Sequence, residues 1–179
     1  MLRIDDCCLV VVDVQGKLAQ LMVDKTTLFE NIRILIQAAK ILDIPILWCQ
    51  QVPNALGPTA LEIAELLADA EPIDKACFSC WGAEPFRERL QATGRKQVLL
   101  CGIETHVCIY QTALDLLTQD YRPTVVADAV SSRSLENRQI ALMRLTAEGI
   151  DIASTEMVLF ELLQSAEHPQ FKAIARLVK

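Results

Sequence analysis

The chain has 179 residues, of which 52% are hydrophobic and 22% are charged, as is typical of one globular domain. Its formal net charge of −6, without a basic face, argues against a nucleic-acid partner. No apolar run is long enough to cross a membrane, and two acidic residues precede the first apolar run, unlike a secretory signal. We therefore expect a cytoplasmic protein of one domain over residues 1–179.

Apolar runs alternate with segments of helical period along the chain. The first apolar run predicts a buried strand at 7–14, and the patterns after it predict a helix at 26–42 and a strand at 44–49. A helix at 59–68 and a short strand around Ile73 follow. The second half predicts helices at 84–92, 105–118, 136–148, 156–164 and 169–177, and strands at 97–101, 123–127 and 150–153.

This order of elements predicts an α/β fold. We expect a three-layer sandwich, in which a doubly wound, mostly parallel sheet carries helices on both faces. Ligands of such sheets bind at the carboxyl ends of the strands, so polar residues at those ends are the first candidates for a site. The high hydrophobic share agrees with a sheet buried on both faces, and an oligomer interface would add to it.

Seven cysteines, at positions 7, 8, 49, 77, 80, 101 and 108, are an odd number, and several lie within predicted strands. Reduced thiols are therefore expected rather than a disulfide framework. Cys77 and Cys80 form a Cys-x-x-Cys pair. It lacks a second pair for zinc, and Trp81-Gly82 follows where a redox motif would open a helix. A redox sensor built on this pair remains one alternative.

Cys108 is distinguished from the other six cysteines by its setting. Gly102 follows a strand, Thr105 fits the N-cap of the next helix, and Cys108 is then the third helical residue. The helix dipole and the free N–H groups of a first turn are expected to lower the pKa of this thiol. The same N–H groups are suited to hold an oxyanion. The alternative is a small buried hydrophobic residue, as we expect for Cys7, Cys8, Cys49 and Cys101.

A base for this thiol has to come from elsewhere in the chain. His106 lies two residues from Cys108, so the two side chains leave a helix in different directions, and His168 is near the carboxyl end. Asp13 closes the first apolar run and is a candidate general base, although a turn or cap role fits its position equally well. Lys75 follows the short strand around Ile73, where a cation would favour the charged forms of Asp13 and Cys108.

The segments VVVDVQ at 10–15, IDKACFSCW at 73–81, GIETHVC at 102–108 and VVADAVSSR at 125–133 together resemble the isochorismatase-like cysteine hydrolases. The resemblance covers almost the whole chain. It implies an Asp–Lys–Cys triad of Asp13, Lys75 and Cys108, with Asp13 as base and Lys75 as its electrostatic partner. It also implies a cis peptide bond between Ile103 and Glu104, and an oxyanion hole made by the backbone N–H groups of Glu104 and Cys108.

The resemblance further places a substrate pocket near Gln15, Trp48, Phe78, Trp81 and Ile103, although the aromatic residues fit a core equally well. It also suggests that Asp128 organises a nearby loop. The nicotinamidases of the superfamily carry a metal-binding Asp-x-His set after the second strand, whereas this chain reads WCQQVPNALGP there. We therefore expect no metal and no cofactor.

The leading hypothesis is hydrolysis of a C–N bond in a small amide or carbamoyl substrate through a thioester on Cys108. The alternative is a non-catalytic oligomeric scaffold or interaction protein on the same fold. For either one the resemblance suggests a homo-oligomer, a dimer or a tetramer. The expected partners are a small molecule and further copies of the chain, with neither nucleic acid nor membrane.

Overall fold

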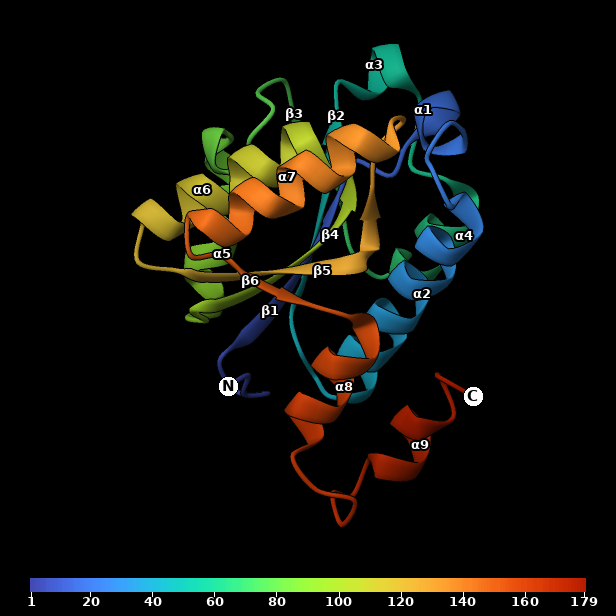
Figure 1. Ribbon diagram of the computed structural model, residues 1–179, viewed down its shortest axis with the longest axis vertical. Coiled ribbons are helices and arrows are strands. Elements are labelled where there is room, and N and C mark those ends of the chain that lie inside the picture. The colour runs from blue at the N-terminus through green and yellow to red at the C-terminus, as the bar shows by residue number, and fades with distance from the viewer.

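The computed structural model describes residues 1–179, which form one six-stranded sheet with helices on both faces (Figure 1). All neighbouring strands run parallel, in the order β3-β2-β1-β4-β5-β6. The strands are β1 (Cys7–Val12), β2 (Ile46–Gln51), β3 (Ile73–Lys75), β4 (Gln97–Ile103), β5 (Arg122–Ser131) and β6 (Asp151–Ala153). The predicted α/β sandwich with a doubly wound parallel sheet is therefore confirmed.

Helices of several lengths connect the strands. The longer ones are α2 (Lys25–Ile41), α5 (Glu84–Thr93), α6 (Tyr110–Thr118), α7 (Leu135–Ala147) and α8 (Thr155–Leu163). Short α-helical pieces are α1 (Gly16–Gln20), α3 (Pro53–Leu56), α4 (Leu61–Ala64) and α9 (Phe171–Ala175). Two 3₁₀ turns, η1 (Glu65–Leu67) and η2 (Cys80–Gly82), and one π-helical turn, η3 (Thr105–Ile109), complete the set. No helix is long and apolar enough to span a bilayer.

The sheet separates two apolar cores, and β1 contributes to both. Leu9 and Val11 pack in the core that includes residues of α2 and α8, whereas Val10 and Val12 pack in the core that includes residues of α5, α6 and α7. In Figure 1 the two groups of helices lie on opposite sides of the strands. Since successive side chains of a strand point to opposite faces, a strand covered on both faces reads as continuously apolar.

The structure extends or shortens several predicted elements. β2 begins and ends two residues later than predicted, and β5 reaches Ser131 because its pairing with β4 shifts in register between Leu100 and Gly102. The helix predicted at 59–68 is divided between α4 and η1. Helices α1 and α3 were not predicted, because four or five residues beside Gly16 or Pro53 carry too little periodicity.

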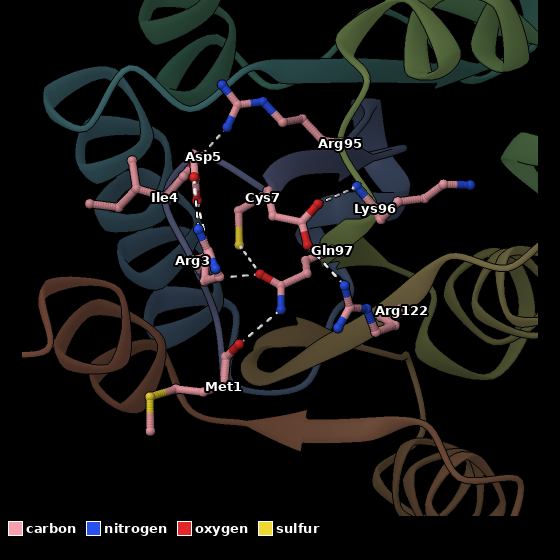
Figure 2. A network of polar contacts seen from close by, with 10 residues as sticks. Met1, Arg3, Ile4, Asp5, Cys7, Arg95, Lys96, Gln97 and Arg122 are labelled. Atoms are coloured by element: carbon pink, nitrogen blue, oxygen red, sulfur yellow. Dashed lines mark hydrogen bonds and ion pairs between the residues drawn. The ribbon is translucent and has the colours of Figure 1, made fainter.

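A polar network closes the amino-terminal edge of the sheet (Figure 2). The side chain of Gln97 accepts a hydrogen bond from the backbone N–H of Arg3 and donates one to the carbonyl of Met1. Asp6 accepts from the backbone N–H of Lys96 and forms an ion pair with Arg122 at 3.0 Å. These contacts join the first residues of the chain to the starts of β4 and β5. The candidate site lies at the opposite, carboxyl edge.

Candidate active site

The three residues of the proposed triad come from three segments that end at the carboxyl edge of the sheet. Asp13 directly follows β1, Lys75 is the last residue of β3, and Cys108 lies in η3 after β4. Asp13 is in the left-handed backbone region, with φ of 52°, at the point where the chain leaves the strand. Residues other than glycine seldom adopt this conformation, and Asp and Asn are among those that adopt it most readily. This turn carries the chain from the end of β1 into the candidate site.

Lys75 and Asp13 form a buried ion pair. Lys75 Nζ lies 2.6 Å from Asp13 Oδ2, and the side chains of the two residues are 0% and 3% exposed. Lys75 also donates to Gln51 Oε1 at 2.6 Å and to the carbonyls of Phe78 at 3.0 Å and Cys77 at 3.2 Å. Burying an ammonium group is costly unless it is paired and hydrogen-bonded, and here oxygen atoms surround it.

The carboxylate of Asp13 is held by Lys75 on one oxygen only. Its other oxygen, Oδ1, is buried and has no conventional hydrogen-bond partner. Burial raises the pKa of Asp13 above its ordinary value, while the charge and hydrogen bond of Lys75 act in the opposite direction. The thiol of Cys108 lies near this carboxylate: it lowers the pKa of Asp13, and Asp13 raises the pKa of Cys108. Asp13 Oδ1 is thus free to accept a hydrogen bond or a proton beside the Cys108 thiol.

Cys108 differs from the expectation of a lowered pKa. Its pKa is raised, first by burial and then by the negative charge of Asp13, and Lys75 offsets only part of this effect. The residue is 6% exposed and packs in the core that includes residues of α5, α6 and α7. A helix start favours a thiolate only if water or cations stabilise the charge as well. This geometry favours the neutral thiol, which would need a base to lose its proton.

The start of the helix also differs from the prediction. Glu104, not Thr105, occupies the N-cap position, and Cys108 is the fourth residue of η3 rather than the third helical residue. No side chain caps this turn, and the buried hydroxyl of Thr105 has no hydrogen-bond partner. The wider π turn accounts for the difference, since π turns insert an extra residue into a helical path and are frequent at functional sites.

The turn before the thiol has an unusual backbone. The peptide bond between Ile103 and Glu104 is cis, as the resemblance implies. Gly102 precedes it with φ of 117°, and a β-carbon at Gly102 would collide with the backbone of Val12 in β1. Glycine is therefore required where β4 passes β1 most closely, immediately before the turn that leads to Cys108.

The five residues assigned to the pocket have different surroundings. Trp48 and Ile103 are buried in the core that includes residues of α2 and α8, the core that does not contain Cys108. The amide of Gln15 is fully buried and bonds Gln51 and Gly57, so it connects β1 to the α3 loop. Phe78 is exposed, and Trp81 packs against Tyr121 with the two rings tilted by 59° at a centroid separation of 5.7 Å. Of the five, Phe78 offers the most exposed side chain near Lys75.

Gln51 is a site residue that the sequence analysis missed. Its Oε1 accepts from Lys75, and its Nε2 donates to the carbonyl of Ala76 at 2.7 Å. Its backbone N–H donates to Gln15 Oε1 at 2.6 Å, so Gln15 acts on Lys75 through Gln51. The sequence signal for Gln51 is the polar pair Gln50-Gln51 at the end of an apolar strand.

The remaining cysteines and acids form no recognisable metal centre. No group of three or more His, Cys, Asp or Glu side chains is gathered closely enough to hold a metal ion. All seven cysteines are free, Cys80 is buried, and Cys77 is partly exposed. Asp128 accepts from the backbone N–H and the hydroxyl of Thr155, both at 2.8 Å, and so anchors the start of α8.

The model of the isochorismatase domain matches residues 7–157, which is most of the chain. The chain belongs to the isochorismatase family. A secreted isochorismatase effector, Isc1 of Phytophthora sojae, is 42% identical over 177 residues, which cover 96% of this chain and 83% of that protein. This family member thus has a relative that is aligned over nearly its full length.

Two solved structures extend this likeness. The MAR1 ribonuclease of Caenorhabditis elegans is 35% identical, with a TM-score of 0.92 over 99% of this chain and 91% of that one. The YCAC gene product of Escherichia coli, described as an octameric hydrolase of unknown specificity, is 25% identical. Its TM-score is 0.92 over 98% of this chain and 88% of that one. Both likenesses support the isochorismatase fold for this chain.

Proposed function

We propose that this protein hydrolyses a C–N bond of a small amide or carbamoyl compound through a thioester on Cys108. The observation that carries this proposal is the buried Lys75–Asp13 ion pair at 2.6 Å, whose carboxylate lies near enough to the Cys108 thiol to raise the pKa of that thiol. A buried ion pair is weak evidence for stability, because desolvation offsets its attraction. The need to hold a catalytic base next to a nucleophile is a sufficient reason for a buried ion pair to be present at this place.

In the first half of the proposed reaction, Asp13 accepts the thiol proton through Oδ1, the oxygen that Lys75 does not hold. The sulfur of Cys108 then bonds to the substrate carbonyl carbon, and the carbonyl oxygen becomes an oxyanion. The backbone N–H groups of Glu104 and Cys108 are the proposed donors to that oxyanion. The C–N bond breaks as Asp13 returns its proton to the leaving nitrogen, which leaves a thioester and an amine.

In the second half, water replaces the amine. Asp13 takes a proton from the water while the water oxygen attacks the thioester carbon, and the C–S bond then breaks. The proton held by Asp13 then passes to the sulfur, which regenerates the neutral thiol and releases the acid product. Lys75 remains protonated throughout and keeps Asp13 in place with one oxygen free. The cycle consumes one water molecule and otherwise requires only side chains and backbone N–H groups of this chain.

The substrate is proposed to be small and partly apolar. The site is nearly closed to solvent, with Cys108 at 6% exposure, and the exposed ring of Phe78 is the proposed apolar contact at its entrance. Of the other residues expected in the pocket, Gln15 supports it by bonding the backbone of Gln51, and Trp81 is a further proposed wall. Trp48 and Ile103 pack on the opposite face of the sheet from Cys108, so they are not proposed to contact the substrate. The cavities of about 550 and 280 Å³ are lined by other residues.

Acylation of Cys108 tests the proposal directly. The protein is incubated with p-nitrophenyl acetate as an activated probe and with a panel of simple amides and N-carbamoyl compounds. Intact-mass measurement and peptide mapping should find one acyl group on Cys108 and turnover of at least one amide or carbamoyl compound. The Cys108→Ala variant should lose both. The Cys77→Ala variant is the matched control, since it removes a more exposed thiol and should keep both.

The same experiment separates the alternatives. A folded protein that neither acylates Cys108 nor turns over any of these compounds would contradict the proposal and favour the scaffold. Because the C. elegans neighbour is described as a ribonuclease, a short RNA oligonucleotide is included as a second candidate substrate. RNA cleavage that survives in Cys108→Ala would also contradict the proposed chemistry. The net charge of −6 favours the small-molecule substrate over RNA.

We further propose that residues 1–179 act as one hydrolase domain, that copies of the chain assemble, and that the protein works in the cytoplasm. The octameric E. coli neighbour supports assembly, so light scattering is expected to give a multiple of the chain mass. A monomer at micromolar concentration would contradict this. The seven free thiols support a reducing compartment, and fractionation tests it against the secreted location named for the P. sojae relative.

A further inference from the structure

The segment after β5 makes hydrogen bonds to the turn that carries Cys108. Glu104 is bonded three times by Arg133. The backbone N–H and Nε of Arg133 each donate to Oε1 at 3.1 Å, and Nη2 donates to Oε2 at 3.3 Å. A second contact lies beside it, between His106 Nδ1 and Ser132 Oγ at 2.9 Å. Two consecutive residues after β5 thus bond two residues of the segment 104–108.

These hydrogen bonds depend on the register between β4 and β5. Ile103 of β4 pairs with Ser131 of β5, so the two chains leave the sheet side by side. Ser131 Oγ also donates to the carbonyl of Val23 at 2.6 Å, and Val23 N–H donates to the carbonyl of Ser132. The segment that holds the turn is therefore itself tied to the loop before α2, and its position is set by more than one contact.

The contact between Glu104 and Arg133 differs from an ordinary surface ion pair. The side chain of Glu104 is 8% exposed, whereas that of Arg133 is 57% exposed. A carboxylate that leaves water needs donors, and here one residue supplies three, including a two-point contact from the guanidinium. Without Arg133, an unpaired negative charge would lie on the residue whose N–H is proposed to face the oxyanion.

We propose that Arg133 is a positioning residue, which holds the Cys108 turn through Glu104 and keeps its backbone N–H groups aimed at the reacting carbonyl. This inference rests on the proposed thioester chemistry. Arg133 acts through the buried carboxylate of Glu104 and does not contact the substrate. The same contact compensates the charge of Glu104 and fixes the position of its side chain. Both the geometry and the charge of the turn therefore depend on Arg133.

The test compares Arg133→Gln, Arg133→Lys and Arg122→Gln in the full chain. Arg122 is a matched control, because it pairs with Asp6 at 3.0 Å on an exposed surface at the opposite edge of the sheet (Figure 2). Acylation by p-nitrophenyl acetate is followed at varied probe concentration. Arg133→Gln should lower the limiting acylation rate by about 100-fold with little change in the half-saturating concentration, as misplaced catalytic groups do.

The other variants have defined outcomes. Arg133→Lys keeps the charge but not the two-point contact, so it should restore part of the rate, while Arg122→Gln should equal the wild type. The double variant Glu104→Gln/Arg133→Gln removes the stranded charge and should recover part of the rate lost in Arg133→Gln. Equal rates in Arg133→Gln and Arg122→Gln would overturn the proposal. A change confined to the half-saturating concentration would assign Arg133 to substrate binding and would also overturn it.

Failure of the proposed function can be told apart from failure of this inference. If the wild type is not acylated at all, the thioester proposal fails, and the reactivity of Cys108 is then measured with iodoacetamide by peptide mapping. The turn is still held by Arg133 in that case, so alkylation of Cys108 should be slower in Arg133→Gln than in the wild type and in Arg122→Gln. Equal alkylation rates, with equal melting temperatures, would overturn the positioning role independently.

Discussion

Gln51 joins Lys75 to the rest of the sheet: its Oε1 accepts from Lys75 Nζ at 2.6 Å while Asp13 holds the same nitrogen at the same distance. Gln51 belongs to β2, the strand that lies between the strand ending at Lys75 and the strand leading to Asp13. The ammonium group therefore bridges three neighbouring strands. Its two closest contacts come from side chains that are themselves buried, which fixes Lys75 and, through it, Asp13.

Replacing Gln51 by Leu should weaken this arrangement. The substitution removes one acceptor from a buried ammonium group, and a hydrogen bond to a charged group contributes about 1.5–3 kcal/mol. We expect that loss in the free energy of unfolding, measured in urea, together with slower acylation of Cys108. Gln50→Leu is the control: Gln50 is also buried, but its amide bonds Thr59 at 2.7 Å rather than Lys75. Equal acylation rates in the two variants would contradict the role given to Gln51.

Replacing Lys75 by Met should be strongly destabilising. It leaves the carboxylate of Asp13 buried without its partner, and breaking a buried pair in this way costs about 3–5 kcal/mol. The exposed pair of Lys40 and Asp69, at 2.8 Å, is the control, and Lys40→Met should cost at most about 1 kcal/mol. Both losses are to be measured by urea unfolding at neutral pH.

A double variant shows whether the charge is the cause. Asp13→Asn/Lys75→Met removes both charges, so it should recover part of the stability lost in Lys75→Met, while remaining inactive. If the double variant is no more stable than Lys75→Met, the loss comes from packing and not from the stranded carboxylate.

Acylation of Cys108 should fall on acidification at a higher pH than an ordinary aspartate would give. Asp13 acts as a base only when ionised, and burial raises its pKa, so protonation begins at a higher pH than in the unfolded chain. The acylation rate of the wild type is measured from neutral to acidic pH. Lys75 stays protonated over this range, so it adds no step to the profile.

Asp13→Asn is the control for this profile. Without the carboxylate, the remaining slow reaction should lose the acidic fall. A wild-type rate that stays constant down to the ordinary range of an aspartate would contradict the raised pKa of Asp13 or its role as base.

Gly102→Ala should disturb the fold at the nucleophile turn. The new β-carbon meets the backbone of Val12 at a position with φ of 117°, and unfavourable backbone conformations of this kind cost on the order of 1–3 kcal/mol each before the steric clash is added. Gly94→Ala is the control, because Gly94 also has positive φ, 67°, but nothing lies near its missing β-carbon. Thermal unfolding should show a clearly larger loss for Gly102→Ala, and equal losses would refute the close approach.

Much of this fold was accessible from the sequence because apolar periodicity reflects burial directly. The runs at 7–14 and 97–101 predicted the two central strands, and Asp13 and Lys75 became candidates because each stands at the end of a predicted strand. Cys108 became a candidate because a glycine and a predicted helix start preceded it. These are local signals, and each depends on a few neighbouring residues.

The rest depended on distances that a sequence does not contain. The raised pKa of Cys108 follows from its burial, which a helix-start argument leaves out. Trp48 lies one position from Cys49, and the alternation of the strand turns it toward the core that does not contain Cys108. Gln51 lay beyond the predicted end of β2. The contact of Arg133 with Glu104 spans 29 positions and follows from the register of β4 on β5.

The order β3-β2-β1-β4 has a consequence for how this enzyme candidate comes into being during folding. The carboxylate, the ammonium group and the thiol lie at positions 13, 75 and 108. They meet only after three crossovers have placed β2 and β4 beside β1 and β3 beside β2. No stretch of chain shorter than this span holds all three residues. A nascent or partly unfolded chain thus has an ordinary set of scattered thiols, and reactive chemistry arises only with the completed centre of the sheet.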